Sequence, residues 1–463
     1  MVVALILGIE VLALVAIVGR ISSVGVFGTP AGAPWLDLEI RPLVSNHMPA
    51  IIGFWAGAAI VAGGYWLARR VSTENLGLKG VALLSLIALV ATSVFVFGIR
   101  VTQAEPNLQT PQEWRLFDPI TRAEASLPPG FTIEAVAPGR SFKFPTAMTM
   151  GDSGEIYVAT AEGIMMVDDD GSGKLDRIRE FAPEMPLTLG LVFDDGVLYA
   201  ASEGSVFRLM DTNGDGLADA SDELISGLPH FVYDSHSNNG MAFGPDGRLY
   251  MTLGGTSDHG PEDSPLAGSV LVMNRDGADL SVYANGFRNP YDLTFCSDGR
   301  LFATDNGPDR LGVLVDEMTT GKLVYNPPDE LNQVYEGRNY GYPEFFGYPA
   351  PWSDSEPPVS FFPKSAVATG ITCYEAKSFP TMYQGNLFVN LWGSIMTRKI
   401  NGHKLVRIEL TETDGFVTGN VHNFANLWRP IDVLVYLDGS LLVLDSEALR
   451  IFRIRYVGDD TRN

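Results

Sequence analysis

The stretch Gly299-Arg-Leu-Phe-Ala-Thr-Asp305 is one of six copies of the same phrase, a turn glycine followed by an apolar strand. Successive copies start 42, 51, 52, 86 and 54 residues apart. Repeats of about 40–55 residues with four strands each are typical of propeller blades. The sequence therefore predicts an all-β fold, a six-bladed β-propeller. The other five copies begin at Gly154, Gly196, Gly247, Gly385 and Gly439.

A second phrase precedes several copies and predicts the neighbouring strand. NPYDLTFCSDG at residues 289–299 and RPIDVLVYLDG at residues 429–439 both end in Asp-Gly, a pair typical of tight hairpin turns. The longest gap contains an insertion at 312–326 and a segment at 340–362 that is too irregular for a seventh blade. We expect a strand near Phe131 to close the ring, and we assign the propeller to residues 130–457.

Three apolar runs precede the propeller, at residues 2–18, 50–67 and 81–99. Each has about the length that crosses a bilayer, and the first lacks the basic start of a signal peptide, which favours a retained helix. Arg69, Arg70 and Lys79 follow the second run, so the positive-inside rule places that connection in the cytoplasm. The sequence thus predicts three transmembrane helices within residues 1–100 and a linker at 101–129. The propeller would lie on the periplasmic, exterior side of the inner (cytoplasmic) membrane.

Charge and composition limit the possible partners. Glu10 lies within the first apolar run, where a carboxylate either pairs with another membrane subunit or reaches a polar region. The net charge is −23, and all of the excess acid lies from residue 105 onward, which argues against nucleic acid. Cys296 and Cys373 are the two cysteines, too few for a disulfide framework or a zinc site, and their pairing stays open.

Two acidic loops predict calcium binding. The first has oxygen-bearing side chains at positions 1, 3, 5, 9 and 12 and a glycine at position 6, the spacing that a Ca²⁺ loop needs. The second is a shorter copy of the same pattern. The alternative for both is a solvated hairpin tip rich in turn residues. The predicted ligands are Asp211, Asn213, Asp215, Asp219 and Asp222 in the first loop, and Asp168, Asp170, Ser172 and Asp176 in the second.

Polar segments stand where a propeller needs only turns. Taken in order, GFRNP from Gly286, DNGPD from Asp305, PDELN from Pro328 and NYGYP from Asn339 resemble the quinoprotein glucose/sorbosone dehydrogenase family. The resemblance covers roughly residues 129–456. Members of that family are six-bladed propellers that bind pyrroloquinoline quinone (PQQ) and Ca²⁺, so the resemblance implies a sugar or aldehyde dehydrogenase.

The resemblance also implies roles for single residues. His236 is similar to the general base that takes the proton of a sugar's anomeric hydroxyl, and Arg288 to the arginine that stabilises the oxyanion of the reduced quinone. Asn289 stands beside it. Gly307 and Pro308 are similar to the pair whose carbonyls hold the cofactor's calcium.

The remaining cofactor contacts depart from the family pattern. Arg429 is similar to a cation that pairs with a PQQ carboxylate, and Arg398 could replace a second cation although it is displaced by one residue. Trp392 stands where the family usually has Lys or His, and Glu162 where it often has Arg. Trp392 could stack on a quinone or fill the channel.

These departures leave two functions open. The first is a membrane-anchored PQQ- and calcium-dependent dehydrogenase that acts on a sugar or aldehyde. The second is a non-catalytic propeller that serves as an accessory or scaffold subunit of a bioenergetic membrane complex, with integral membrane partner subunits. Three predicted helices, where one would anchor an enzyme, favour the second function, and the intact GFRNP and DNGP segments favour the first. A calcium lactonase would need converging carboxylates that the sequence does not provide.

Overall fold

The structure is a computed structural model that describes residues 119–136, 141–169, 175–183, 185, 187–230, 236–257, 260–308, 314–316, 322–324, 327–345, 347, 349, 353–393 and 401–458. Almost all of them belong to one of the chain's two units, formed by Pro106–Arg310 and Asp316–Asn463. The three segments predicted to cross the membrane lie outside the described residues. Across those described ranges, no helix is long and apolar enough to cross a bilayer.

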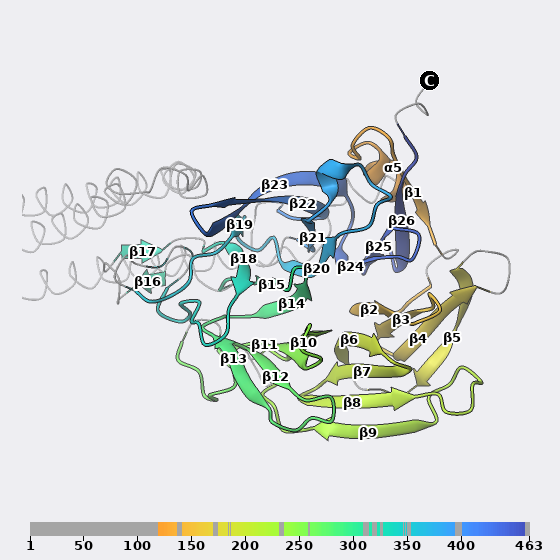
Figure 1. Ribbon diagram of the computed structural model, residues 1–463, viewed down its shortest axis with the longest axis horizontal. Coiled ribbons are helices and arrows are strands. Elements are labelled where there is room, and N and C mark those ends of the chain that lie inside the picture. The colour runs from red at the N-terminus through yellow and green to blue at the C-terminus, as the bar shows by residue number, and fades with distance from the viewer. Residues whose placement is uncertain are drawn as a thin grey trace, which may run out of the picture. The chain divides into compact units, whose positions relative to one another are not determined.

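Six four-stranded antiparallel sheets confirm the predicted six blades (Figure 1). The first three blades are β2–β5 (Ala147–Met150, Ile156–Thr160, Gly163–Asp169, Leu175–Pro183), β6–β9 (Thr188–Asp194, Val197–Ser202, Ser205–Met210, Ala220–Ile225) and β10–β13 (Asn238–Phe243, Leu249–Leu253, Ser269–Met273, Ser281–Asn285).

Blades four and five follow the same plan, and blade six takes its fourth strand from the other end of the chain. They are β14, β15, β18 and β19 (Pro290–Phe295, Leu301–Asp305, Asp329–Val334, Ser360–Phe362); β20–β23 (Ala368–Tyr374, Asn386–Leu391, Lys404–Thr413, Phe416–Asn426); and β24–β26 with β1 (Pro430–Val435, Leu441–Asp445, Arg450–Tyr456, Phe131–Ala135). A separate two-stranded sheet pairs β16 (Leu314–Asp316) with β17 (Lys322–Val324).

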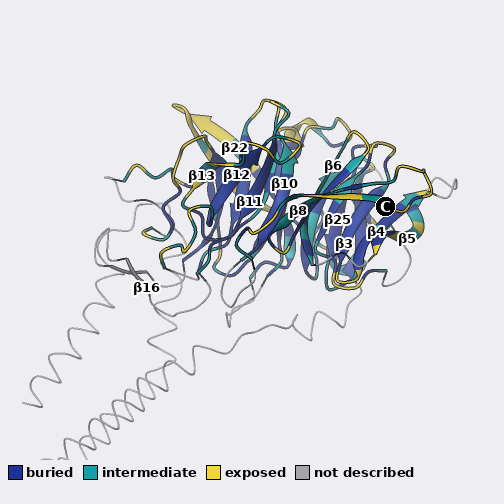
Figure 2. Cartoon of the chain, turned by 90° about the horizontal axis from the view of Figure 1, so that it is seen from below, coloured by how far each residue is buried: buried dark blue, intermediate teal, exposed yellow. Residues whose placement is uncertain are grey.

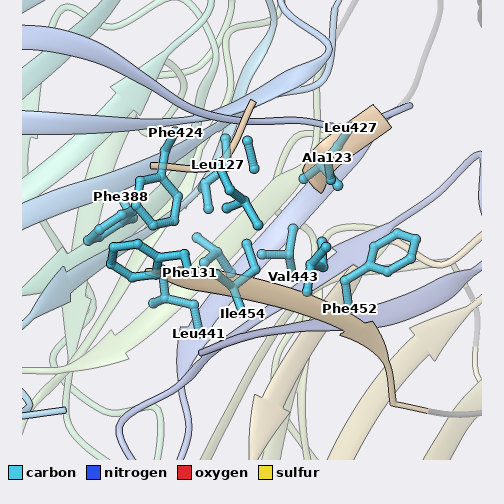
Figure 3. Packing of buried hydrophobic residues seen from close by; sticks show 14 of the residues in the cluster. Ala123, Leu127, Phe131, Phe388, Phe424, Leu427, Leu441, Val443, Phe452 and Ile454 are labelled. Carbon is cyan, nitrogen blue, oxygen red and sulfur yellow. The ribbon is translucent and has the colours of Figure 1, made fainter. Parts of the chain in front are cut away.

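Strand β1 closes the ring as predicted. It pairs antiparallel with β26, in register from Phe131 opposite Tyr456 to Ala135 opposite Phe452. The Phe131 ring then packs edge-on against Phe379 and Phe424 of blade five, with ring centroids 4.7 Å and 5.0 Å apart. Figure 3 shows Phe131 within this apolar cluster, beside Phe388, Phe424 and Leu441. Strand β1, which comes first in the propeller sequence, therefore joins blade six to blade five.

The repeated phrase forms the second strand of each blade. In the copy at Gly299, the glycine has a φ of +88°, which a residue with a Cβ adopts only with strain, and the Arg300 N–H donates to the Asp298 carboxylate at 3.0 Å. Every residue of β15 is buried, because the strand lies between its sheet neighbours and the adjoining blades. Figure 2 shows buried strands in the interior of the propeller and exposed residues at its hairpin tips and on part of its outer strands.

The innermost strands form a closed ring, with β2, β6, β10, β14, β20 and β24 in contact in that order. Each of the last five has a register irregularity near its start. Asp292 of β14 accepts the Ile371 N–H of the next blade at 2.9 Å, and Asp432 of β24 accepts the Met148 N–H of the next at 2.6 Å. Two aspartates thus tie blade four to five and blade six to one.

Three details add to the sequence expectations. The linker predicted at residues 101–129 contains helix α5 (Pro119–Glu124), after which the Ser126 hydroxyl accepts the Asn426 N–H at 2.7 Å. Residues 340–362 contribute β19, the fourth strand of blade four, and a 3-10 turn η1 (Thr381–Tyr383) follows β20. Cys296 and Cys373 form a disulfide between blades four and five, a pairing that the sequence left open.

Candidate functional site

Antiparallel alternation brings the predicted site residues to one end of the ring. In each blade, the start of the first strand, the end of the second and the start of the third lie at the same end of the sheet. His236 precedes β10, Arg288 and Asn289 precede β14, and Gly307 follows β15. We call this end the mouth; its predicted site residues are His236, Arg288, Asn289, Gly307, Pro308 and Arg429. Arg398 lies outside the described residues.

A backbone contact fixes the orientation of His236. Its Nδ1 lies 3.1 Å from the carbonyl oxygen of Gly255, and its backbone N–H lies 3.0 Å from the same oxygen. A carbonyl only accepts, so Nδ1 carries the proton and Nε2 is the basic ring nitrogen. That tautomer is the one required of a general base acting through Nε2.

Gly255 connects the histidine to the arginine. The Gly255 N–H donates to the carbonyl oxygen of Arg288 at 2.7 Å, while its own carbonyl accepts from His236. The neighbouring Gly254 allows the close packing, because a Cβ there would lie 2.2 Å from the His236 Cβ and 2.8 Å from the Asn289 Oδ1. Two consecutive glycines after β11 therefore bring the predicted base beside the Arg288-Asn289 pair.

A buried carboxylate shapes the loop that carries Arg288. Asp305, at the end of β15, accepts the N–H of Arg288 at 3.1 Å and the N–H of Asn289 at 2.7 Å. Burial raises the pKa of Asp305 to about 6, and these donors oppose the rise. In blade six, Asp445 shapes the loop that carries Arg429 in the same way, because it accepts the N–H groups of Trp428 and Arg429 at 2.9 Å and 3.0 Å.

Glu330 is the direct cross-strand neighbour of Asp305. Its Oε1 accepts the Gly347 N–H at 2.8 Å, and Asn332 donates to its Oε2 at 3.3 Å. Burial, with Asp305 as a smaller contribution, raises the pKa of Glu330 well above its usual value. This shift favours the neutral form of Glu330 beside Arg288. The corresponding partner of Asp445 is the oppositely charged Arg450.

Both carboxyl groups line a small pocket beside Arg288. Its volume is about 10 Å³, room for about one water molecule. Its lining combines three aromatic residues with residues at the ends of β15 and β18. The lining residues are Gly286, Arg288, Asp305, Gly307, Pro308, Pro328, Glu330, Tyr340, Tyr342 and Phe345.

Asn306 provides a test of whether the mouth suits a polar ligand. Its side chain is 5 % exposed, and neither amide atom has a hydrogen-bond partner among the described residues. A buried amide of this kind usually binds water or a ligand, because leaving it unpaired costs about 1–3 kcal/mol. It directly precedes Gly307 and Pro308, so this part of the mouth fits a polar group and a cation held by backbone carbonyls.

Arg429 is already engaged within the protein. Its guanidinium carbon lies 3.8 Å from the centre of the Trp392 ring, and its Nη1 donates to the Gly393 carbonyl at 2.8 Å. The Trp392 Nε1 in turn donates to the Ser446 hydroxyl at 2.7 Å. Trp392 therefore stacks on a cation and does not line the pocket beside Arg288. This arrangement fits a PQQ carboxylate less well than the family pattern implies.

The first predicted calcium loop uses its carboxylates within the chain. Asp211 accepts the Gly214 and Gly216 N–H groups, each at 2.7 Å, and Asp222 pairs with Arg208 at 2.7 Å. The Asp219 carboxylate accepts from the N–H and hydroxyl of Thr212, and Asn213 and Asp215 accept from backbone N–H groups two residues on. Calcium binding here stays a prediction.

The second loop is described only at its ends, since Asp170 and Ser172 lie outside the described residues. Asp168 pairs with Arg177 at 2.6 Å and with Arg179 at 2.8 Å, and the Arg177 hydrogen bond is the main cause that holds the pKa of Asp168 below its usual value. Asp176 is half-buried. Within the described ranges, no three His, Cys, Asp or Glu side chains gather as a metal site would require.

The six-bladed fold of this chain is similar to that of solved PQQ-dependent sugar dehydrogenase propellers. The PQQ domain of pyranose dehydrogenase from Coprinopsis cinerea is 14 % identical, covers 71 % of this chain and 96 % of its own, and superposes with a TM-score of 0.59. The PQQ-bound aldose sugar dehydrogenase from Streptomyces coelicolor is 22 % identical over 71 % of this chain and 99 % of its own, with a TM-score of 0.53.

The chain belongs to the family described as Domain of unknown function (DUF7133), whose model matches residues 121–447. An uncharacterized protein of Borreliella burgdorferi is 22 % identical over 71 % of this chain and 90 % of its own length. Quinoprotein glucose dehydrogenase B of Acinetobacter calcoaceticus is 27 % identical over 158 residues, which are 27 % of this chain and 29 % of that enzyme.

Sequence reasoning missed three residues that shape the mouth. Gly255 carries the link between His236 and Arg288, and Asp305 and Glu330 lie beside Arg288. The sequence contained one signal for Asp305. Two of the six repeated phrases end in aspartate, and in the structure each of these aspartates pairs with the proline that follows Asn289 or Arg429.

Proposed function

We propose that this chain is a PQQ- and calcium-dependent dehydrogenase that oxidises the anomeric hydroxyl of a sugar or a hydrated aldehyde. One observation carries the proposal: the Gly255 peptide holds the Nδ1 of His236 on one side and the Arg288 carbonyl on the other. A base with a defined tautomer is thus linked through one peptide to the residue that carries a buried cation, at the end of the ring that also contains Gly307 and Pro308. A histidine used only for packing needs neither neighbour.

The residues present divide the chemistry between them. The Nε2 of His236 takes the hydroxyl proton as the carbon bearing that hydroxyl loses a hydride. PQQ, when bound, supplies the two-electron acceptor for that hydride. Arg288 and the amide of Asn306 suit the carbonyl oxygens of such an acceptor, and the carbonyls of Gly307 and Pro308 suit Ca²⁺. An aldose would give the lactone, with one proton left on the histidine.

The proposal includes the location inferred from sequence. The three apolar runs would anchor the enzyme in the inner membrane as a multi-pass protein, with the propeller on the periplasmic side. The Cys296–Cys373 disulfide supports an oxidising compartment, because structural disulfides persist mainly outside the cytosol. Membrane partner subunits would contact the helices and receive the electrons.

A second candidate is the scaffold subunit of a membrane complex. The engagement of Arg429 by Trp392 and Gly393 favours it, because a tricarboxylate needs cations that are available to bind it. In this case the protein would be obtained in stable association with integral membrane subunits and would neither bind PQQ nor oxidise sugars.

Reconstitution separates the two candidates. The full-length protein, purified in detergent, is incubated with PQQ and CaCl₂ and assayed for dye reduction with a panel of aldoses and aldehydes. Turnover that needs both additions supports the dehydrogenase. No turnover with any substrate, together with co-purifying membrane subunits, supports the scaffold.

A further inference from the structure

Asp329 lies at the mouth but ties together loops of two different blades. It is the first residue of β18, and its side chain is buried. Its Oδ1 accepts the Gly307 N–H at 3.0 Å, and its Oδ2 accepts the Val367 N–H at 2.7 Å. Gly307 follows the second strand of blade four, and Val367 precedes the first strand of blade five. One carboxylate therefore links the Gly307–Pro308 loop to the neighbouring blade.

The contact to Val367 holds a strained backbone. Val367 has a φ of +56°, in the left-handed region that β-branched residues avoid. Such a conformation persists where its surroundings determine it. Besides Asp329, the Trp392 N–H donates to the Val367 carbonyl at 2.9 Å. The two peptide groups flanking the strained residue are thus held by Asp329 and by the backbone of Trp392.

The linkage continues to the cation of blade six. Trp392 stacks on Arg429 with 3.8 Å between the guanidinium carbon and the ring centre. A series of direct contacts therefore runs from Gly307 through Asp329, Val367 and Trp392 to Arg429. At its other end, a Cβ on Gly307 would lie 2.4 Å from the Pro328 carbonyl oxygen, so this glycine packs tightly against the residue preceding Asp329.

We propose that Asp329 is a positioning residue, whose carboxylate fixes the Gly307–Pro308 loop relative to Val367 and the Trp392–Arg429 pair. The inference deepens the proposed function, on which it rests for the ligand that these loops would meet. Asp305 and Asp445 shape only loops of their own blades. Asp329 determines instead how two parts of the mouth are spaced, and it need not touch the ligand.

The test uses hydrogen exchange, which needs no activity. Asp329→Asn has one oxygen for two N–H donors, so at least one of the Gly307 and Val367 amides loses its acceptor and meets an NH₂ group. We expect peptides from full-length protein that contain either residue to exchange at least 10-fold faster in Asp329→Asn. Asp292→Asn is the matched control, since Asp292 also joins blades four and five but through Ile371. It should leave exchange at Gly307 unchanged.

Calcium titration separates this inference from the proposed function. With Ca²⁺ alone as the probe, we expect binding at least 10-fold weaker in Asp329→Asn than in the wild type. Unchanged exchange at both amides overturns the positioning role, even if activity falls. Faster exchange supports that role, and a wild type that binds neither Ca²⁺ nor PQQ then refutes only the proposed function. Should Asp329→Asn unfold, Val367→Gly relieves the backbone strain, and the double variant is compared with Val367→Gly alone.

Discussion

At the scale of single residues, the mouth shows how peptide groups can prepare a side chain for chemistry. The Gly255 carbonyl sets the tautomer of His236, and the Gly255 N–H ties the same peptide to Arg288. Both contacts are made by uncharged peptide groups. They fix the orientation of the His236 ring and leave it able to act as a base. Gly254 also keeps bulk away from the space between His236 and Asn289.

Replacing the base tests this arrangement. We expect His236→Gln to lower kcat of the PQQ-loaded enzyme by about 10²–10⁴-fold, the usual contribution of a general base, with PQQ affinity nearly unchanged. His422→Gln is the control, because that imidazole is half exposed and pairs with Glu409 on the hairpin of β22 and β23. Dye-linked steady-state assays and a PQQ titration measure both quantities. An unaltered kcat in His236→Gln would remove His236 from the chemistry.

At the scale of elements, the innermost strands pack so closely that glycine is required between blades. A Cβ at Gly240 of β10 would lie 2.0 Å from the Asp292 Oδ1 and 2.8 Å from the Asp292 Cα. Because the second of these atoms is backbone, strand β14 itself would have to move.

Gly240→Ala should therefore destabilise the propeller, by about 1–3 kcal/mol or more, as overpacking does. Gly260→Ala is the control, since the nearest atom to its added Cβ would be 3.4 Å away. Urea unfolding of the two variants measures the difference in free energy of unfolding. Equal stability of the two variants would mean that the inner ring is looser than the structure indicates.

The two aspartates between blades should make stability depend on pH. Burial raises the pKa of Asp292, and burial together with the nearby Asp292 raises that of Asp432. A raised pKa means that the folded state holds the proton more tightly than the unfolded state. The contribution of these two groups to stability is therefore greatest below pH ~4, the ordinary aspartate pKa, and is lost as the pH rises toward neutral.

Asp432→Asn removes one titrating group of the pair, so we expect a shallower loss of unfolding free energy between pH 4 and pH 8. The slope does not vanish, because burial also raises the pKa of Asp305 and Asp445. Asp222→Asn, at a largely exposed carboxylate, should keep the wild-type slope. Thermal unfolding across this pH range provides the measurement, and equal slopes in all three proteins would contradict the account.

At the scale of the whole molecule, the disulfide and β1 hold the ring together. Cys296 and Cys373 are 77 residues apart in the chain and join neighbouring blades. A cross-link over a long loop restricts the unfolded chain, which typically adds about 2–4 kcal/mol of stability. We expect Cys296→Ala/Cys373→Ala to unfold at correspondingly lower urea concentration. Reductant should destabilise the wild type and leave the double variant unaffected; no effect on either protein would contradict the bond.

The sequence predicts those features of the fold best that depend on residues close together in the chain. The turn glycines and Asp-Gly pairs encode hairpins by their own conformational preferences, so the six blades follow from six phrases. The mouth depends on contacts between blades, which have no local signal. Nothing near Trp392 in the sequence indicates that Arg429 is its stacking partner, and the raised pKa of Glu330 arises from burial, with Asp305 as a smaller contribution. The family resemblance placed His236 and Arg288 at one end without the Gly255 peptide that joins them.

Calorimetric titration of PQQ into the full-length protein tests the central claim most directly. With saturating Ca²⁺, the wild type should bind one PQQ per chain, and removal of Ca²⁺ with chelator should abolish or strongly weaken binding. Arg288→Ala should bind PQQ at least 10-fold more weakly in the presence of Ca²⁺. If the folded wild type with Ca²⁺ shows no saturable binding of PQQ, the mouth is not a quinone site and the dehydrogenase assignment is wrong.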